Sequence, residues 1–306
     1  MGFAVSRKGK QNLSLGWKSY SRENILSSES SLNPKPDCLI HLEVKHHVMN
    51  PTAKDERMFH QVNVVQLNDW LSWCERHQVE RVIYFSSIKA VSGGEGLLDE
   101  LATGPGESIY GRTKWQAECR LKEWAEADPR RRGLIVRPAV IYGPGNRANM
   151  YSFVSAIERK RFFLVGQNQN IKSIVSLKNV VSAVHYLSHR MKPGLEVYNL
   201  VDRQNYGVEA LASMISRALG QSGRIRRIPM WTARAMGLMG DVVQSTTGLG
   251  VPLTSDRVRA LTENTEFSCR KLMESGYKHA ESTEDGIKNL VNWFLQETRE
   301  SHGNRS

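Results

Sequence analysis

The sequence lacks any apolar run long enough to cross a membrane, and it shows no secretory leader. Its 306 residues contain no stretch of about 18 consecutive apolar residues, the length that a membrane-spanning helix needs. The first 17 residues include basic side chains but no apolar segment of the kind that signal peptides carry. We therefore expect a protein without a membrane span.

Cysteine is scarce as well. The four cysteines, Cys38, Cys74, Cys119 and Cys269, lie far apart in the sequence and match no zinc-binding spacing. This excludes a zinc finger, and we expect no metal site. Isolated buried thiols are typical of proteins in a reducing compartment, so we expect the protein to be cytoplasmic.

Acidic residues are outnumbered by basic ones, 31 to 42, which gives a net charge of +11. Such a field attracts anions such as nucleotides, nucleotide sugars, nucleic acid or acidic lipid headgroups. The basic residues are spread over several short clusters, and no known nucleic-acid-binding motif accompanies them. We therefore expect a solvated basic surface and no nucleic-acid partner.

Short apolar runs alternate with helical patterns in the first half of the chain. Residues 37–42, 81–85 and 133–141 have the composition of buried strands, and residues 58–77 and 108–127 have apolar side chains at helical spacing. This alternation predicts an α/β fold with a doubly wound parallel sheet. Ligands of such sheets bind outside the carboxyl ends of the strands.

The pattern changes after about residue 145. Helical stretches there mix with short strands, which predicts a domain over residues 1–145 and a smaller C-terminal domain over residues 146–300. We expect the strands near 174–177 and 197–201 to rejoin the sheet of the first domain.

Two C-terminal segments have patterns of their own. Residues 228–243 are apolar and rich in methionine, which suits a membrane surface or a cap over a substrate, although core or lid packing is the more frequent role. A final helix is predicted from the capping-box spacing of Ser282 and Asp285. Its apolar face contains Ile287, Leu290, Val291 and Phe294.

The helix at 108–127 contains a pair of residues with catalytic chemistry. Tyr110 and Lys114 lie one helical turn apart, and an ammonium near a phenol lowers the phenol pKa toward that of a general base. Ser86 and Ser87 follow the preceding strand, and Pro138 lies in the next one. Each residue alone has an ordinary explanation, such as a surface aromatic, a helix cap or a strand terminator. Together, at one edge of a sheet, they indicate a site.

These residues lie in segments that resemble a known family. The segments DCLIHLEVKHH, RVIYFSSIKAVSG, YGRTKWQAE and GLIVRPAVIYGPG are similar to the extended short-chain dehydrogenase/reductase family. Its NAD-dependent epimerase/dehydratase members, of the UDP-glucose 4-epimerase type, are the most similar. The resemblance runs from about residue 37 to the C-terminus and implies a Rossmann-like fold with a C-terminal substrate domain.

The resemblance implies a catalytic role for each residue of this group. Tyr110 would take the proton from the sugar C4 hydroxyl, and Lys114 would lower the tyrosine pKa and hold the nicotinamide ribose. Ser87 would orient the hydroxyl, with Ser86 as the less favoured candidate, and Pro138 would border the nicotinamide. The implied cofactor is NAD, with NADP as the alternative.

The resemblance also implies a nucleotide-sugar substrate, and with it a place in polysaccharide biosynthesis. Asn149 matches a position near the uracil, and Lys172 matches a position near the diphosphate where relatives usually have arginine. Lysine at this position keeps the positive charge of arginine but cannot form arginine's two parallel hydrogen bonds to a phosphate. Relatives often form homodimers through the helices that flank the Tyr-x-x-x-Lys segment, so a homodimer is expected here.

The N-terminus departs from the family pattern. The sequence has no G-x-x-G-x-x-G motif to bind the cofactor pyrophosphate. Gly2 matches the second glycine of that motif, with Val5 in place of the third, and residues 20–36 are expected to form a loop. Glu43 replaces a small residue next to the cofactor, where its charge would repel the pyrophosphate. We therefore expect an N-terminally incomplete Rossmann-like domain with an exposed sheet edge.

These departures leave alternative functions open. One is a non-catalytic relative that keeps the fold but has lost tight NAD binding. The others are a 4-keto-sugar reductase and a 3β-hydroxysteroid-type dehydrogenase, which shares the Ser-Ser-Ile pattern of residues 86–88. The function that the resemblance favours is C4 epimerisation of a UDP-hexose, but because a fold does not determine its substrate, the sequence does not choose the sugar.

Overall fold

The computed structural model divides the chain into two compact units. The first comprises Met1–Gly93, Ala102–Arg137 and Leu187–Tyr198, and the second comprises Gly94–Leu101, Pro138–Tyr186 and Asn199–Ser306. The residues that the structure describes are 2–6, 17–27, 35–45, 52–92, 96–167, 170–222, 225–247, 254–255, 258 and 262–303.

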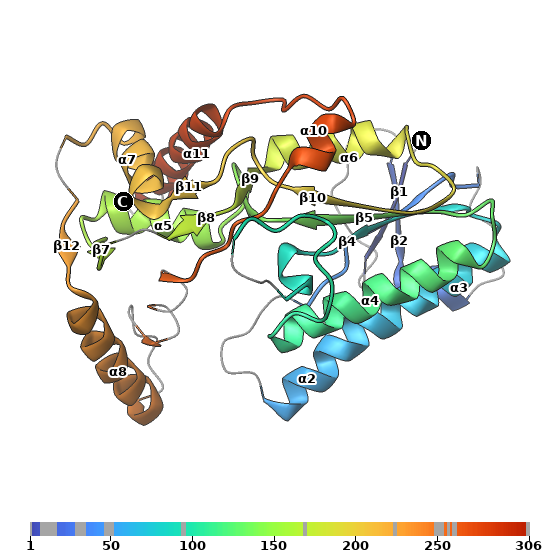
Figure 1. Ribbon diagram of the computed structural model, residues 1–306, viewed down its shortest axis with the longest axis horizontal. Coiled ribbons are helices and arrows are strands. Elements are labelled where there is room, and N and C mark those ends of the chain that lie inside the picture. The colour runs from blue at the N-terminus through green and yellow to red at the C-terminus, as the bar shows by residue number, and fades with distance from the viewer. Residues whose placement is uncertain are drawn as a thin grey trace. The chain divides into compact units, whose positions relative to one another are not determined.

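A four-stranded sheet forms the centre of the first unit (Figure 1). Its order is β10 (Gly194–Leu200), β5 (Arg132–Pro138), β4 (Arg81–Phe85) and β3 (Leu39–His41). The strands β3, β4 and β5 run parallel to one another. The predicted parallel α/β fold is confirmed, and the strands at 37–42 and 81–85 lie where the sequence predicted them.

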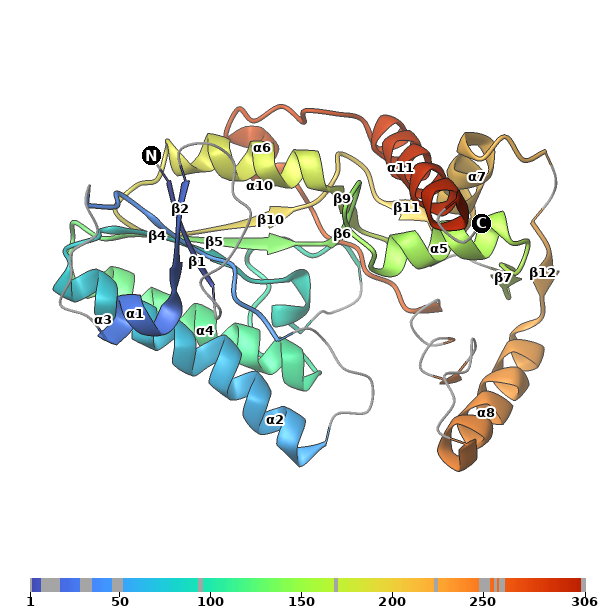
Figure 2. The ribbon, with the colours of Figure 1, turned by 180° about the vertical axis from the view of Figure 1, so that it is seen from behind.

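Helices cover one face of this sheet (Figures 1 and 2). A continuous helical segment contains α2 (Ala53–His60), a π-helical turn (Gln61–Val65) and α3 (Gln66–Arg76). It begins at a capping box in which Thr52 and Asp55 bond each other's backbone N–H groups. The helix α4 (Ile109–Glu126) packs beside it. The predicted helices at 58–77 and 108–127 are therefore confirmed.

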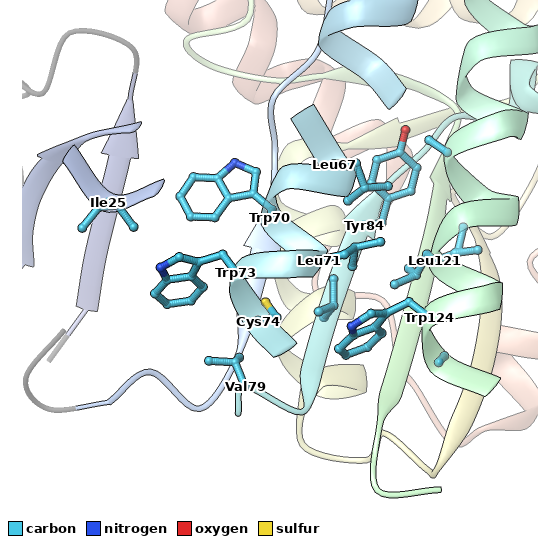
Figure 3. Close-up of a cluster of buried hydrophobic side chains, with 14 residues drawn as sticks. Ile25, Leu67, Trp70, Leu71, Trp73, Cys74, Val79, Tyr84, Leu121 and Trp124 are labelled. Atoms are coloured by element: carbon cyan, nitrogen blue, oxygen red, sulfur yellow. The ribbon is translucent and has the colours of Figure 1, made fainter. Parts of the chain in front are cut away.

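The core between α3, α4 and the sheet is rich in tryptophan (Figure 3). Trp70, Trp73 and Cys74 of α3 lie in one cluster with Leu121 and Trp124 of α4. All five side chains are buried, and burial of such large apolar surfaces is the main force that holds the helices on the sheet.

The N-terminal residues differ from the expectation. Strand β1 (Gly2–Ser6) pairs in parallel with β2 (Trp17–Ser21), and the helix α1 (Arg22–Ser27) follows. The prediction of a loop over residues 20–36 is therefore wrong for 20–27. Among the described residues β3 has no neighbour beyond β4, and Ile40 is 48% exposed. This matches the exposed sheet edge expected from the sequence.

The described residues of the second unit form three short strand pairs. These are β6 (Val140–Tyr142) with β9 (Ile174–Ser176), β7 (Leu164–Val165) with β12 (Arg227–Ile228), and β8 (Ile171–Lys172) with β11 (Tyr206–Gly207). The predicted strand at 133–141 is thus divided at Ala139, because β5 and β6 pair with different strands. Of the two strands expected near 197–201 and 174–177, the first corresponds to β10, which pairs with β5 in the central sheet. The second corresponds to β9, which pairs with β6 outside that sheet.

Six helices in the described part of the chain accompany these strands: α5 (Asn149–Glu158), α6 (Leu177–Ser188), α7 (Val208–Ala218), α8 (Met230–Thr247), α10 (Arg270–Glu274) and α11 (Thr283–Gly303). In α11 the predicted cap is present, since the Asp285 N–H donates to Ser282 Oγ over 3.1 Å. Its predicted apolar face is buried in a cluster with α5 and α7. No helix in the described residues combines the length and the apolarity needed to cross a bilayer.

A buried carboxylate joins the elements of the second unit. Asp202 accepts hydrogen bonds from Tyr142 Oη at 2.7 Å, Asn179 Nδ2 at 2.8 Å and Thr283 Oγ1 at 3.0 Å. These donors come from β6, α6 and the start of α11. A carboxylate with this many donors is stable when buried, and each donor that is removed leaves it less satisfied.

We expect Tyr142→Phe to lower the free energy of unfolding by about 1–3 kcal/mol, because it removes one donor and leaves the buried Asp202 oxygen less satisfied. Urea unfolding followed by circular dichroism measures the difference. Tyr206→Phe, a change at a half-buried tyrosine of the same unit, is the control. Equal stability of the two variants would contradict the assigned role of Asp202.

Candidate active site

Tyr110 lies in the first turn of α4, next to the segment that follows β4. The helix is capped by Ser108, whose Oγ accepts the Gly111 N–H at 3.0 Å. The Tyr110 ring packs edge-on against Phe59, with 6.3 Å between the ring centroids. The Ser87 hydroxyl is close enough to its phenol to lower the Tyr110 pKa. Ser87 itself caps the short 3-10 turn Ile88–Ala90.

Lys114 is 1% exposed and lies one turn further along α4. Its Nζ donates to the Phe85 carbonyl oxygen at 2.7 Å and lies 4.6 Å from the centroid of the Tyr84 ring. Burial lowers the Lys114 pKa to about 7, against a smaller opposing effect of the Glu118 charge. The ammonium is therefore fixed at the carboxyl end of β4.

The expected effect of Lys114 on the Tyr110 pKa is not found. Burial raises the Tyr110 pKa above its ordinary value of 10, and the contribution that lowers it comes from the hydrogen bond with Ser87. Desolvation of the buried phenol, which the spacing of Tyr110 and Lys114 in the sequence does not reveal, is the larger effect here. Tyr110 is accordingly a phenol, not a phenolate, at neutral pH.

A buried ion pair joins α4 to β5. Glu118 and Arg137 are each 4% exposed at the side chain and form a bidentate pair, with Arg137 Nη2 at 2.6 Å and Nε at 3.0 Å from the two carboxylate oxygens. Ser86 Oγ also donates to Glu118. Ser86 is therefore held by the ion pair, and Ser87 is the serine that meets Tyr110. The sequence reasoning missed Glu118 and Arg137, although a charge within the apolar strand 133–141 was a visible signal.

Two glycines allow the loop that carries Ser87 to approach α4 closely. A Cβ atom added at Gly106 would lie 2.1 Å from the Lys89 carbonyl oxygen, and one added at Gly111 would lie 2.2 Å from the same atom. The Gly106 N–H also donates to the Ala90 carbonyl oxygen at 2.9 Å. Glycine at both positions therefore permits the close approach of the Ile88–Ala90 turn to the start of α4.

His41 and Tyr84 place further polar atoms at the same end of the sheet. They are opposite each other in β3 and β4, with ring centroids 5.7 Å apart. Both are buried, and within the described part of the chain no side chain or backbone group forms a hydrogen bond with the ring nitrogens of His41 or with the Tyr84 hydroxyl. Burial, together with the nearby Lys114 charge, lowers the His41 pKa to about 3. His41 is therefore neutral at physiological pH.

Glu43 is not an isolated charge. Its Oε2 accepts a hydrogen bond from the Trp70 indole at 3.3 Å and lies 3.9 Å from Arg22 Nη1. The sequence argument expected this carboxylate to repel a cofactor pyrophosphate. The neighbouring guanidinium, which that argument did not consider, offsets the negative charge.

Of the predicted site residues, Ser87 lies within side-chain reach of Tyr110, and Lys114 is buried one turn further along α4. Gly2 lies in β1 and not in a loop. Pro138 ends β5 and is buried, and it belongs to the second unit. The remaining two also belong to that unit: Asn149 begins α5 and is exposed, and Lys172 in β8 donates to the Glu263 carbonyl oxygen. The roles of these four residues remain predictions.

Comparison with known proteins identifies a family and several relatives. The sequence model of the NAD dependent epimerase/dehydratase family matches residues 22–200. The N-acetyl-alpha-D-glucosaminyl-diphospho-ditrans,octacis-undecaprenol 4-epimerase of Escherichia coli O157:H7 is 28% identical over 259 residues, which are 84% of this chain and 77% of that protein. The UDP-glucose 4-epimerase of Vibrio cholerae is 26% identical over 268 residues, 84% of this chain and 76% of that protein.

Solved structures share the fold. The UDP-glucuronic acid 4-epimerase from Bacillus cereus in complex with NAD superposes with a TM-score of 0.70 at 15% identity, covering 93% of this chain and 83% of that one. MoeE5 in complex with UDP-glucose and NAD gives a TM-score of 0.69 at 18% identity, covering 97% and 91%. At this identity the similarity shows a common Rossmann fold with a C-terminal domain.

We expect Gly111→Ala to displace the Ser87 loop, because the added methyl would overlap the Lys89 carbonyl. The change should alter the near-ultraviolet circular dichroism of the tyrosines and lower any activity of the site by about tenfold or more, since small misplacements of catalytic groups are costly. Arg112→Ala, at the exposed neighbouring position, is the control. Wild-type activity and spectrum in Gly111→Ala would show that the close packing does not position Ser87.

The lowered pKa of His41 predicts how the free energy of unfolding changes with pH. The unfolded chain binds a proton at His41 near pH 6.5, whereas the folded chain leaves it neutral down to about pH 3. The free energy of unfolding should therefore fall as pH drops through this window, with a contribution of up to about 1.4 kcal/mol per pH unit. His41→Leu should remove that contribution, and His60→Leu, at an exposed position, should keep it. Parallel curves for all three proteins between pH 4 and 7 would refute the assignment.

Proposed function

The chain belongs to the NAD dependent epimerase/dehydratase family, and on this basis we propose that it inverts the C4 configuration of a hexose carried on a nucleoside diphosphate, with NAD as its cofactor. The observation that carries the proposal is that Ser87 and Tyr110 lie within side-chain reach of each other, with the buried Lys114 one turn further along the same helix. These groups lie at the carboxyl end of a parallel sheet, where ligands of such folds bind.

Each residue of the group has a separate task in this proposal. Tyr110 exchanges a proton with the C4 oxygen of the sugar. Ser87 donates a hydrogen bond to the same oxygen and thereby orients it toward Tyr110. Because burial raises the Tyr110 pKa, the phenol is the resting form, so its use as a base should increase as the pH rises. NAD, when bound, would accept the hydride and return it to the other face of the sugar.

The nicotinamide end of NAD fits the groups that the structure places together. Lys114 donates to the Phe85 carbonyl oxygen, and in its protonated form it has two further N–H donors. In this proposal those donors bind the ribose hydroxyls of NAD, as the family resemblance implies. Pro138 would border the nicotinamide, and Gly2 would contribute to the cofactor site. Asn149 and Lys172 would contact the uracil and the diphosphate of the substrate.

Two further points belong to the same proposal. The reaction would supply an epimerised sugar for polysaccharide synthesis in the cytoplasm, and the active form would be a homodimer. A second candidate substrate is favoured by the relative from E. coli, whose name specifies a sugar on diphospho-undecaprenol. The same C4 chemistry would then act on a sugar whose diphosphate is attached to a lipid and not to a nucleoside.

The experiment follows the conversion of UDP-glucose to UDP-galactose with added NAD. We expect Tyr110→Phe to lower kcat by about 10²–10⁴-fold, the usual contribution of a general acid–base group. Ser87→Ala should lower it less, and Tyr151→Phe, a change of the same kind on α5, should leave it unchanged. Titration calorimetry with NAD is run in parallel.

The outcomes separate the alternatives. Absence of NAD binding at millimolar cofactor would indicate a non-catalytic relative and would overturn the proposal. Stoichiometric consumption of NADH with a keto substrate, without epimerisation, would indicate a reductase. Wild-type activity in Tyr110→Phe would remove the assigned chemistry even if NAD binds.

A further inference from the structure

The helix α8, drawn in orange in Figures 1 and 2, carries apolar side chains that the described residues of the second unit leave exposed. Three of its largest side chains are mostly exposed: Trp231 by 73%, Leu238 by 63% and Met239 by 69%. Met236 and Val243 are 42% and 44% exposed. At 100° per residue these five positions fall on one side of the helix, which we call the outer face of α8.

The opposite side of α8 is the one that packs. Ala233 is fully buried in a cluster with Val165 and Val258. A Cβ atom at Gly237 would lie 3.1 Å from the Ser255 backbone nitrogen, so the chain approaches closely there. Asp241 accepts the Ser255 N–H at 3.1 Å on this side. The sequence expectation that residues 228–243 serve core packing therefore holds for half of the helix only, and the outer face has no such explanation.

The charges around α8 are mainly positive. Arg226 and Arg227 lie three to four residues before its first residue, Met230, Arg234 lies on it, and all three are exposed. Arg227 is paired with Glu209 at 2.8 Å. Asp241 is the one acidic residue in the sequence of α8, and its carboxylate faces the packed side. The outer face is thus an apolar surface with a basic border and no acidic side chain of its own helix.

We propose that the outer face of α8 docks on the surface of an anionic membrane. A helix with Trp and Leu on one side and arginine at its border has the composition of helices that lie in the bilayer interface. Tryptophan is favoured at that depth, and each arginine near an anionic surface adds to the binding. Monomeric soluble proteins rarely expose a contiguous apolar surface of this kind without a partner.

Charge complementarity favours a membrane over a second copy of the chain. The net charge is +11, so two copies that meet through a face with a basic border repel each other, whereas the same border is attracted by acidic headgroups. The docking face concerns α8 alone and does not depend on the epimerase proposal. If both hold, the lipid-linked form of the sugar becomes the preferred substrate, because enzyme and substrate then share one surface.

Sedimentation with phosphatidylglycerol–phosphatidylcholine vesicles tests the proposal on the full chain, without sugar or NAD. We expect the wild type to bind these vesicles and to bind pure phosphatidylcholine vesicles more weakly. Leu238→Gln/Met239→Gln should weaken binding by about tenfold or more, since each side chain loses its transfer into the interface. Both positions are exposed, so the melting temperature should not change.

The matched control is Leu97→Gln/Leu101→Gln, which replaces two apolar side chains of the same unit that are 58% and 83% exposed. It should bind vesicles as the wild type does. Failure of the wild type to bind anionic vesicles overturns the proposal, as does equal binding by the two double variants. A wild-type dimer that Leu238→Gln/Met239→Gln converts to monomers, without vesicle binding by either, would assign the face to a second copy. Because neither sugar nor NAD is present, none of these results bears on the epimerase assay.

Discussion

The site depends on how α4 is anchored to the ends of β4 and β5 by buried charges. Glu118 pairs with Arg137 on β5, and Lys114 donates to the last carbonyl of β4. Burying these groups is costly unless each is paired with good geometry, so the helix has few alternative positions. The catalytic proposal requires this rigidity, because Tyr110 and Ser87 lie on different elements and must share one oxygen of a substrate.

Close backbone packing completes this arrangement. Gly106 and Gly111 let the loop after β4 contact the start of α4. In that loop Ser86 donates a hydrogen bond to Glu118, whereas the neighbouring Ser87 lies near Tyr110. Adjacent serines in extended backbone point to opposite sides, which explains why only one of them serves the site. The apolar core of α3 and α4 supplies the stability that permits so many buried polar groups.

The sequence predicted the parallel sheet and the two long helical segments at 58–77 and 108–127, because periodicity and strand order depend on local pattern. It did not predict the division of the strand at 133–141, which results from pairing with residues far along the chain. It also assigned the wrong direction to the Tyr110 pKa, because desolvation depends on packing that a sequence does not display. Similarly, residues 228–243 were visibly apolar, but their division into a packed and an exposed face required the structure.

The pKa of Tyr110 tests the account most directly, because it reports both the burial of the phenol and its bond to Ser87. It can be measured by ¹³C NMR titration of protein labelled at tyrosine Cζ, with Tyr110→Phe to assign the signal. The account predicts a pKa above the ordinary value of 10, and a further rise in Ser87→Ala. A pKa below 10, or one that Ser87→Ala leaves unchanged, would contradict it.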